Sequence, residues 1–203
     1  MHPTPVFHWD THSELVAFVT ARAFATVCAT IDGALVAAQV PVLIDASGTQ
    51  LALHLSRANP LARALPQQVL VLVAGADAYV SPDWYDEPHQ VPTWNYVSVE
   101  IRGELVGTDD ARLVEILRRQ STMFEARIAG KPPWTLDQMP AATLAAKLKG
   151  IVGATLQIAS INGTRKLSQN KTDADRAGIV TALNASPRAA DCEIAGLVRT
   201  LRS

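Results

Sequence analysis

The stretch ATVCATI-DG-ALVAAQVPVLI, residues 25–44, decides the fold class of this chain. Two runs rich in valine, alanine and leucine flank the dipeptide Asp32-Gly33. Asp-Gly is a strongly preferred two-residue hairpin turn, because both of its positions need positive φ angles. The stretch therefore predicts two antiparallel strands joined by a tight turn.

Residues that follow the hairpin extend the predicted sheet. In residues 51–56 leucine alternates with smaller or polar residues, which places His54 and Ser56 on the strand face opposite the leucines. Residues 69–74 are almost continuously apolar, as in a central strand, and residues 97–105 alternate apolar with polar side chains. The chain thus carries the strands of a β-rich core.

The C-terminal third contains one more predicted strand pair. Residues 151–161 predict a long strand, and the turn signal Asn162-Gly163 predicts a short return strand over residues 164–167. The segment KLSQNK, residues 166–171, then places amide, hydroxyl and ammonium groups within six residues.

Helices are predicted where a capping residue or a starting proline precedes apolar residues at helical spacing. Thr108 is the predicted cap of the third of these helices. The predicted helices cover residues 11–22, 60–65, 108–127, 140–150, 172–183 and 187–201.

Aromatic side chains are concentrated in YVSPDWYDEPHQVPTWNY, residues 79–96. Ser81-Pro82 and Val91-Pro92 favour extended backbone before each proline, so the sequence predicts a rigid loop between two strands. Such a loop either closes one end of a hydrophobic core or forms a wall for a flat ligand. In the second case Trp84, Trp94 and Tyr96 offer ring faces, and the amide of Asn95 both donates and accepts hydrogen bonds.

Length and charge limit the classes of function. The 203 residues suffice for a single domain with a full core, and no linker divides residues 1–203. The formal net charge of -1 argues against electrostatic capture of nucleic acid. No basic region precedes an apolar run at the start, and no segment is long enough to span a bilayer, so we expect a cytoplasmic protein without membrane contact.

Several catalytic signatures are absent from the sequence. There is no GxGxxG, Walker loop, HExxH or CxxC, and His2, His8 and His12 lack the partners of a metal site. Ser168 and Lys171 match S-x-x-K, but the companion elements of the penicillin-recognising enzymes are missing. We expect no metal and assign no catalytic residue.

Polar and aromatic groups at the predicted strand ends suit a planar, phosphorylated ligand better than hydrolysis. Ser56 and Arg57 end a strand just before Pro60 begins a helical turn, where hydroxyl, guanidinium and backbone N–H groups can converge on a phosphate. The alternative is that Arg57 is a solvated arginine at a strand end.

Five blocks of the sequence stand out together: HLSRANP (54–60), DAYVSPDWY (77–85), VPTWNY (91–96), KGIVG (149–153) and KLSQNK (166–171). In order and spacing, up to about Leu183, these blocks resemble the PaiB family of FMN-binding negative transcriptional regulators.

The resemblance implies an α+β protein, an antiparallel split β-barrel flanked by helices, with C-terminal helices at about residues 172–203. It also implies FMN as cofactor and a homodimer with FMN near the subunit interface. Ser56 and Arg57 would hold the FMN phosphate, with Lys166 as a second cation. The full set of candidate cofactor residues is His54, Ser56, Arg57, Asn59, Trp94, Asn95, Tyr96, Lys166, Gln169 and Asn170.

The chain departs from the family pattern at two positions. Gln39 stands where relatives usually have histidine, and Glu100 lies where the strand after VPTWNY commonly carries one. Functions that need those imidazoles are therefore in question, whereas the fold is not.

Three functions follow as expectations. The first is an FMN-binding protein that is regulatory or weakly redox-active, and the second is an FMN-dependent oxidoreductase with a nicotinamide donor. The third is a repressor that binds DNA directly, which the even charge distribution makes doubtful.

Overall fold

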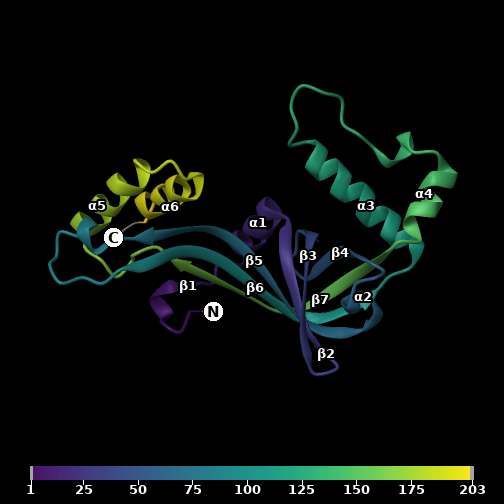
Figure 1. Cartoon of the computed structure of the whole chain (residues 1–203), viewed down its shortest axis with the longest axis horizontal. Coiled ribbons are helices and arrows are strands. Elements are labelled where there is room, and N and C mark those ends of the chain that lie inside the picture. The colour runs from purple at the N-terminus through teal and green to yellow at the C-terminus, as the bar shows by residue number, and fades with distance from the viewer. Residues whose placement is uncertain (1, 202–203) are drawn as a thin grey trace. The chain divides into compact units, whose positions relative to one another are not determined.

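The computed structural model describes residues 2–201, which form seven strands and six α-helices. Figure 1 shows their arrangement. The strands are β1 (His8–Trp9), β2 (Phe24–Ile31), β3 (Ala34–Ile44), β4 (Gln50–Ser56), β5 (Gln67–Val80), β6 (Thr93–Gly107) and β7 (Ile151–Lys166). The helices are α1 (His12–Arg22), α2 (Pro60–Arg63), α3 (Asp110–Glu125), α4 (Ala141–Leu148), α5 (Asp173–Asn184) and α6 (Ala189–Arg199). Short 3-10 helices are η1 (Pro5–Phe7), η2 (Pro82–Trp84) and η3 (Leu136–Gln138).

The predicted hairpin is confirmed as β2 and β3. The two strands pair in antiparallel register from Phe24 opposite Pro41 to Ile31 opposite Ala34. The turn residues Asp32 and Gly33 have φ angles of 50° and 79°, as this turn requires.

The strands form one antiparallel system that closes on itself. Their order is β1-β7-β4-β3-β2-β5-β6, and β7 also pairs with β6. This extra pairing joins β7, β4, β3, β2, β5 and β6 into a closed ring, which leaves β1 as an added strand. The predicted antiparallel β-barrel flanked by helices is confirmed.

The described residues divide into two compact units. Unit 1 contains residues 2–10, 74–99 and 162–201, and unit 2 contains residues 11–73 and 100–161. The strands β5, β6 and β7 each contribute residues to both units.

The core of unit 2 lies between its strands and helices. Leu51, Leu53 and Leu55 of β4 are at most 1% exposed, as the alternation of that strand predicts. Helix α3 buries Leu113 and Ile116, and Ile116 packs against Leu43 and Ala52 of the sheet. Burial of each such side chain contributes about 1.5–3 kcal/mol.

The predicted cap of α3 was wrong by one residue. The side chain of Asp109, not Thr108, accepts the backbone N–H of Arg112 at 2.7 Å. The backbone N–H of Thr108 instead donates to the carbonyl of Gly153 at 2.8 Å, so Thr108 belongs to the strand end.

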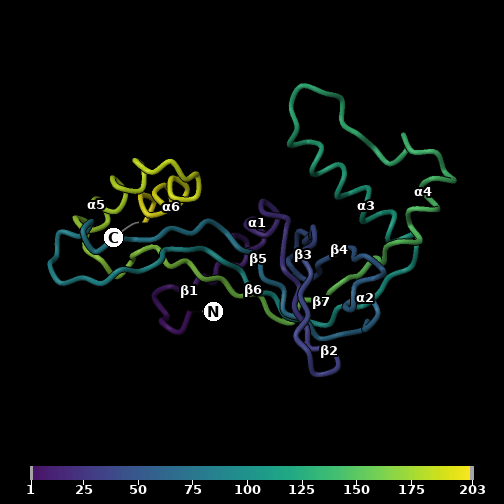
Figure 2. The backbone as a smooth tube through the Cα atoms, viewed as in Figure 1, coloured from purple at the N-terminus to yellow at the C-terminus, as the bar shows by residue number. Residues whose placement is uncertain are grey.

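The predicted turn at Asn162-Gly163 was also wrong, because β7 continues unbroken to Lys166. The tube in Figure 2 shows β7 as one long strand. In this part of β7, Gly163 and Thr164 pair with Trp9 and His8 of β1. Pairing with a strand from the N-terminus therefore holds the Asn-Gly dipeptide in extended geometry.

The aromatic loop is shorter than predicted. Strand β5 extends to Val80 and β6 begins at Thr93, so the connection comprises residues 81–92 and includes η2. Trp94, Asn95 and Tyr96 consequently lie in a strand, where neighbouring side chains point to opposite faces.

In unit 1, α5 and α6 lie side by side near the 81–92 connection (Figures 1 and 2). The carboxylate of Asp175, which is 1% exposed, accepts the backbone N–H groups of Asp86 and Glu87 at 2.9 and 3.2 Å. The hydroxyl of Thr172 caps α5 by accepting the backbone N–H of Asp175. These bonds fix the connection to the start of α5.

Two helical glycines provide a matched test of this packing. A Cβ atom at Gly178 of α5 would lie 2.2 Å from the carbonyl oxygen of Trp84, whereas one at Gly196 of α6 would meet no atom of the described residues within 4 Å. We expect Gly178→Ala to lower the free energy of unfolding by about 1–3 kcal/mol, because the backbone must shift. Gly196→Ala should raise it by about 0.5–1 kcal/mol. Urea denaturation of both variants measures the difference; equal stabilisation would contradict the close approach of α5 to η2.

Candidate functional site

The candidate residues fall into two groups, one in each unit. His54, Ser56, Arg57 and Asn59 lie at the end of β4 in unit 2. The others, Trp94, Asn95, Tyr96, Lys166, Gln169 and Asn170, lie in unit 1.

Arg57 is exposed, and its guanidinium is held in place by backbone carbonyls. Nε donates to the carbonyl of Lys149 and Nη2 to the carbonyl of Ile151, both at 2.9 Å. The backbone N–H of Arg57 donates to the carbonyl of Gly150. With the N–H of Nε and one N–H of Nη2 so engaged, the two N–H groups of Nη1 and the second N–H of Nη2 remain for a ligand. An oriented guanidinium loses less freedom when it binds an anion.

Ser56 and Asn59 differ in their availability. Within residues 2–201, the exposed Ser56 hydroxyl accepts only a long bond of 3.4 Å from the backbone N–H of Ala58. Asn59 is the N-cap of α2, and its Oδ1 accepts the backbone N–H of Leu61 at 2.9 Å. Ser56 can therefore turn toward a ligand, whereas Asn59 has only its amide nitrogen to offer.

His54 is half-buried and connects β4 to α3. Its Nδ1 lies 2.9 Å from Oε1 of Gln120, and Nε2 of Gln120 donates to the carbonyl of Pro41 at 3.0 Å. Since the glutamine nitrogen must face the carbonyl, its oxygen faces His54, which assigns the proton to Nδ1. Burial lowers the pKa of His54, and the bond to Gln120 opposes this only in part. His54 is thus neutral at pH 7, with Nε2 as an acceptor.

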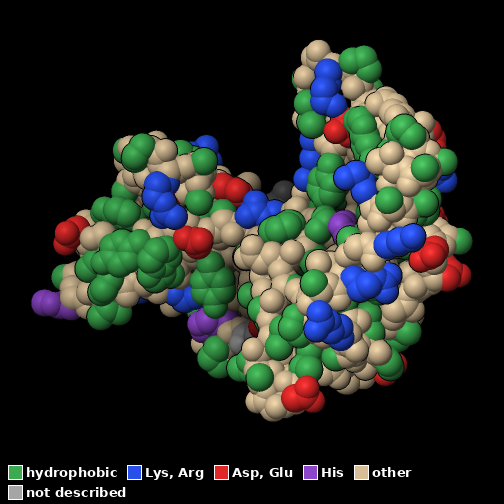
Figure 3. Space-filling view, turned by 45° about the vertical axis from the view of Figure 1, so that its right-hand side comes forward, with side chains coloured by type: hydrophobic (Ala, Val, Ile, Leu, Met, Phe, Trp, Pro, Cys, Tyr) green, Lys and Arg blue, Asp and Glu red, His purple; other side chains and the backbone are tan. Residues whose placement is uncertain are grey.

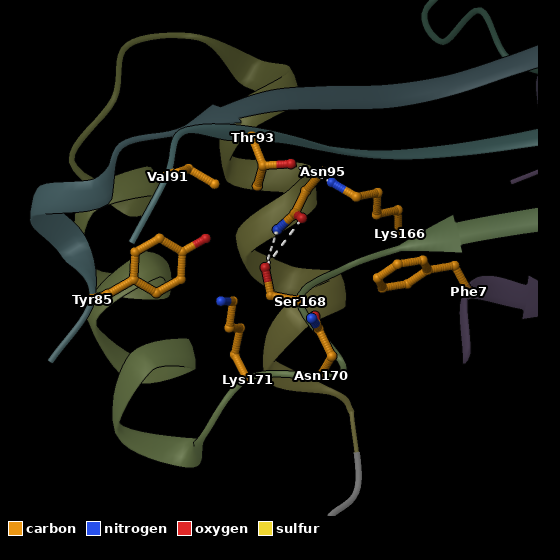
Figure 4. A pocket seen from close by; sticks show the side chains of 9 residues that line it. All are labelled: Phe7, Tyr85, Val91, Thr93, Asn95, Lys166, Ser168, Asn170 and Lys171. Atoms are coloured by element: carbon orange, nitrogen blue, oxygen red, sulfur yellow. Dashed lines mark hydrogen bonds between the residues drawn. The ribbon is translucent and has the colours of Figure 1, made fainter. Parts of the chain in front are cut away.

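Unit 1 contains a pocket of about 200 Å³ whose lining comes from five segments of chain. Figure 4 shows the lining side chains around it. They are Phe7 of η1, Tyr85 and Val91 of the 81–92 connection, Thr93 and Asn95 of β6, Lys166 of β7, and Ser168, Asn170 and Lys171 of the following turn.

The buried polar residues of this pocket are Asn95 and Ser168, which are 0% and 4% exposed. The Asn95 amide nitrogen donates to the Ser168 hydroxyl oxygen at 3.1 Å, and that hydroxyl lies 3.2 Å from the amide oxygen (Figure 4). Ser168 has a φ angle of 64°, in the left-handed region that serine rarely adopts. The side chain of Gln169 stabilises this turn, since its Oε1 accepts the backbone N–H of Leu167 and its Nε2 donates to the carbonyl of Arg165.

Two lysines supply positive charge to the pocket. Nζ of Lys166 donates to the Thr93 hydroxyl and to the carbonyl of Trp94, and lies 5.8 Å from the centre of the Phe7 ring. Nζ of Lys171 donates to the amide oxygen of Gln90 at 2.5 Å. Burial, followed by the neighbouring charge of Lys171, lowers the pKa of Lys166.

Tyr85 contributes a polar group without a well-formed partner. Its hydroxyl oxygen is buried and makes no hydrogen bond of good geometry within residues 2–201, although the nearby Ser168 hydroxyl stabilises its ionised form. Burial, and then the charge of Asp175, raises the pKa of Tyr85. Nζ of Lys171 lies 4.9 Å from the centre of the Tyr85 ring. The hydroxyl is therefore a neutral donor that a ligand can satisfy.

The structure brings together three of the six unit 1 candidates, Asn95, Lys166 and Asn170. The strand alternation turns Trp94 and Tyr96 away from Asn95, and the half-exposed Trp94 ring makes an edge contact with Tyr79 at 6.0 Å. Residues that the candidate set did not contain are Phe7, Tyr85, Val91, Thr93, Ser168 and Lys171. All of these except Phe7 belong to the blocks that carry the family resemblance.

Solved structures with the same fold place this chain among split β-barrel proteins. The FAD and heme binding protein from Mycobacterium smegmatis matches with a TM-score of 0.60 at 20% identity, covering 84% of this chain and 78% of that one. The flavocytochrome Anf3 from Azotobacter vinelandii matches with a TM-score of 0.55 at 20% identity, over 80% of this chain and 74% of that one. At such identities the matches show the fold.

Sequence comparison then assigns the family. Residues 1–160 match the family described as "Putative FMN-binding domain". The protease synthase and sporulation protein PAI 2 of Bacillus subtilis is 30% identical over 174 residues, which is 84% of this chain and 83% of that protein. The uncharacterised protein AN0679 of Emericella nidulans is 28% identical over 200 residues, covering 79% of each chain. This chain belongs to the FMN-binding, PaiB-type family, and FMN is the cofactor that this membership assigns to it.

No helix within residues 2–201 has the length and hydrophobicity needed to cross a membrane.

Proposed function

We propose that this chain is a cytoplasmic, homodimeric FMN-binding protein that acts in gene regulation or in weak redox chemistry. Family membership supports the cofactor. The name of the Bacillus subtilis relative, which refers to protease synthesis and sporulation, supports a regulatory role.

The observation that carries the cofactor site is the orientation of Arg57. An exposed guanidinium fixed by two backbone carbonyls, beside the exposed Ser56 hydroxyl, fits a phosphate group. We define these two residues as the phosphate site. The neutral imidazole of His54 offers an acceptor on the same strand, and the amide nitrogen of Asn59 offers a donor. Bound FMN supplies the electron transfer, whereas the chain orients the cofactor and excludes water from it.

Exposed apolar side chains of unit 1 support the proposal that the protein is a homodimer. The half- to largely exposed side chains Val6, Tyr79, Val91 and Trp94 belong to this unit. Figure 3 shows hydrophobic side chains gathered on the viewer's face of this part of the molecule, at the left. Apolar side chains exposed together favour contact with a second copy.

The test of the cofactor is the visible spectrum of the natively purified protein, followed by titration with FMN. We expect a flavin spectrum, or quenching of flavin fluorescence that saturates at one FMN per chain. A colourless protein that leaves FMN fluorescence unchanged contradicts the proposal.

Two further experiments separate the alternative functions. Anaerobic mixing of the FMN-loaded protein with NADH or NADPH tests the oxidoreductase, which requires flavin reduction faster than that of free FMN. A mobility-shift assay across a salt series tests direct DNA binding, since phosphate contacts weaken steeply with salt. With a net charge of -1, we expect no salt-sensitive shift.

A further inference from the structure

The pocket of unit 1 combines cationic charge with a volume that is small for FMN. Sites for drug-sized ligands generally measure about 300–1,000 Å³, and this pocket measures about 200 Å³. A cavity of about 150 Å³ lined by apolar side chains holds a benzene molecule. The pocket of unit 1 therefore has room for one ring or a short chain together with a charged head group.

The charges of the pocket select an anion. Lys166 and Lys171 both line it, and its described lining contains neither aspartate nor glutamate. The carboxylate of Asp175, whose charge acts on Tyr85, already accepts the backbone N–H groups of Asp86 and Glu87, and its contacts with Thr172 also favour its ionised form. Two ammonium groups without an acidic partner in the lining favour an anionic ligand.

Neutral hydrogen-bond donors and apolar side chains of the pocket indicate the rest of the ligand's chemistry. The buried Tyr85 hydroxyl lacks a well-formed hydrogen bond, and the Asn95–Ser168 pair presents an amide and a hydroxyl at 0% and 4% exposure. Phe7 and Val91 supply apolar surface to the same pocket. Such a lining fits an oxyanion attached to an apolar body better than a bare inorganic ion.

FMN carries a single phosphate, and the proposed function assigns that phosphate to Ser56 and Arg57 of unit 2. The charges of Lys166 and Lys171 then remain for another ligand. The geometry points to a second binding site in this pocket, for a small organic carboxylate about the size of benzoate. The inference rests on the proposed function, since it requires the phosphate of FMN to lie at Arg57.

Calorimetric titration of the FMN-saturated full-length protein with benzoate tests this site, with inorganic phosphate titrated in parallel. We expect one benzoate per chain and weaker binding of phosphate. Lys171→Met should weaken benzoate binding about tenfold or more, because it removes a charge-assisted contact. Lys147→Met, an exposed lysine of α4, is the matched control and should leave the affinity unchanged.

Tyr85→Phe keeps the ring and removes only the hydroxyl that lacks a well-formed hydrogen bond. It therefore tests the pocket independently if Lys171→Met fails to fold. We expect its benzoate affinity to fall about fivefold. Affinity should also decline as the pH rises toward 10, since the pKa of Lys166 is lowered and its ammonium loses its proton earlier than that of a free lysine. In Lys171→Met one of the two causes of this lowering is absent, so the decline should shift to higher pH.

Three outcomes overturn the inference. The first is no benzoate binding, or binding that Lys171→Met and Tyr85→Phe leave unchanged. The second is phosphate binding tighter than benzoate with the same dependence on Lys171, which overturns the carboxylate assignment. The third is loss of FMN affinity in Lys171→Met with riboflavin affinity unchanged, because the pocket would then hold the phosphate of FMN. If the protein does not bind FMN at all, the proposed function is wrong. Benzoate titration of the apoprotein then tests the pocket of unit 1 by itself.

Discussion

Gly103→Ala is expected to lower the free energy of unfolding by about 3 kcal/mol or more, the upper end of the range for overpacking. A Cβ atom at this position of β6 would lie 2.1 Å from the carbonyl oxygen of Gln157 in β7 and 3.0 Å from the Leu156 side chain. The first of these atoms belongs to the backbone of the partner strand and cannot rotate away. The substitution therefore disrupts the β6–β7 pairing that closes the ring of strands.

Thermal and urea denaturation measure this effect. For a protein of this length, about 3 kcal/mol corresponds to a fall in Tm of about 6–12 °C. Gly107→Ala is the control, because among residues 2–201 a Cβ at Gly107 in the same strand would meet only the side chain of Leu65, at 3.7 Å. If the two variants are equally stable, β6 and β7 do not approach each other as closely as the structure indicates.

Features of the fold that depend on neighbouring residues in sequence could be predicted. The hairpin of β2 and β3 depends on Asp32-Gly33 and the patterns beside it, and the cap of α5 depends on Thr172 and Asp175. In both cases the residues that determine the geometry are adjacent or within one helical turn. Closure of the barrel by β6 and β7 came only from the family resemblance, since no local pattern specifies which distant strands pair.

The errors have a common physical cause, which is pairing with a distant segment. Asn162-Gly163 favours a turn on its own, but β1 pairs with this part of β7 and keeps it extended. Phe7 lies in the pocket because the N-terminal segment packs in unit 1, and no motif around it indicates this. Long-range contacts of this kind leave no local sequence signal.

The unit 1 pocket is lined by residues from the predicted blocks, but by only three of the six single residues proposed in that unit. VPTWNY and KLSQNK both reach the pocket, but the position at which β6 begins was missed. With the strand starting at Thr93, a period of two places Asn95 in the pocket and turns Trp94 to the other face. Which side chains face the pocket thus depends on where β6 begins. The prolines of the loop led to a predicted start after Tyr96, whereas the strand begins at Thr93.

Arg57→Met is expected to weaken FMN binding about 10- to 150-fold, which corresponds to the loss of one charge-assisted hydrogen bond of about 1.5–3 kcal/mol. The exposed Arg63 of α2 provides the matched control, and Arg63→Met should bind FMN as the unaltered chain does. Arg57→Lys should restore only part of the affinity, since a compact ammonium keeps the charge but lacks the planar fork with which the guanidinium bonds the carbonyls of Lys149 and Ile151 and faces the ligand.

Riboflavin separates a phosphate contact from a defect in the fold, because it differs from FMN only in lacking the phosphate. The bonds from Arg57 to Lys149 and Ile151 also hold the start of β7 beside β4, so loss of the side chain affects the strand end itself. If Arg57 binds the phosphate, fluorescence titration should show Arg57→Met losing FMN affinity while its riboflavin affinity stays the same. Equal losses for both flavins would mean that Arg57 acts by positioning the strand end. In that case the phosphate of FMN must bind elsewhere, and the paired lysines of unit 1 become its strongest candidate site.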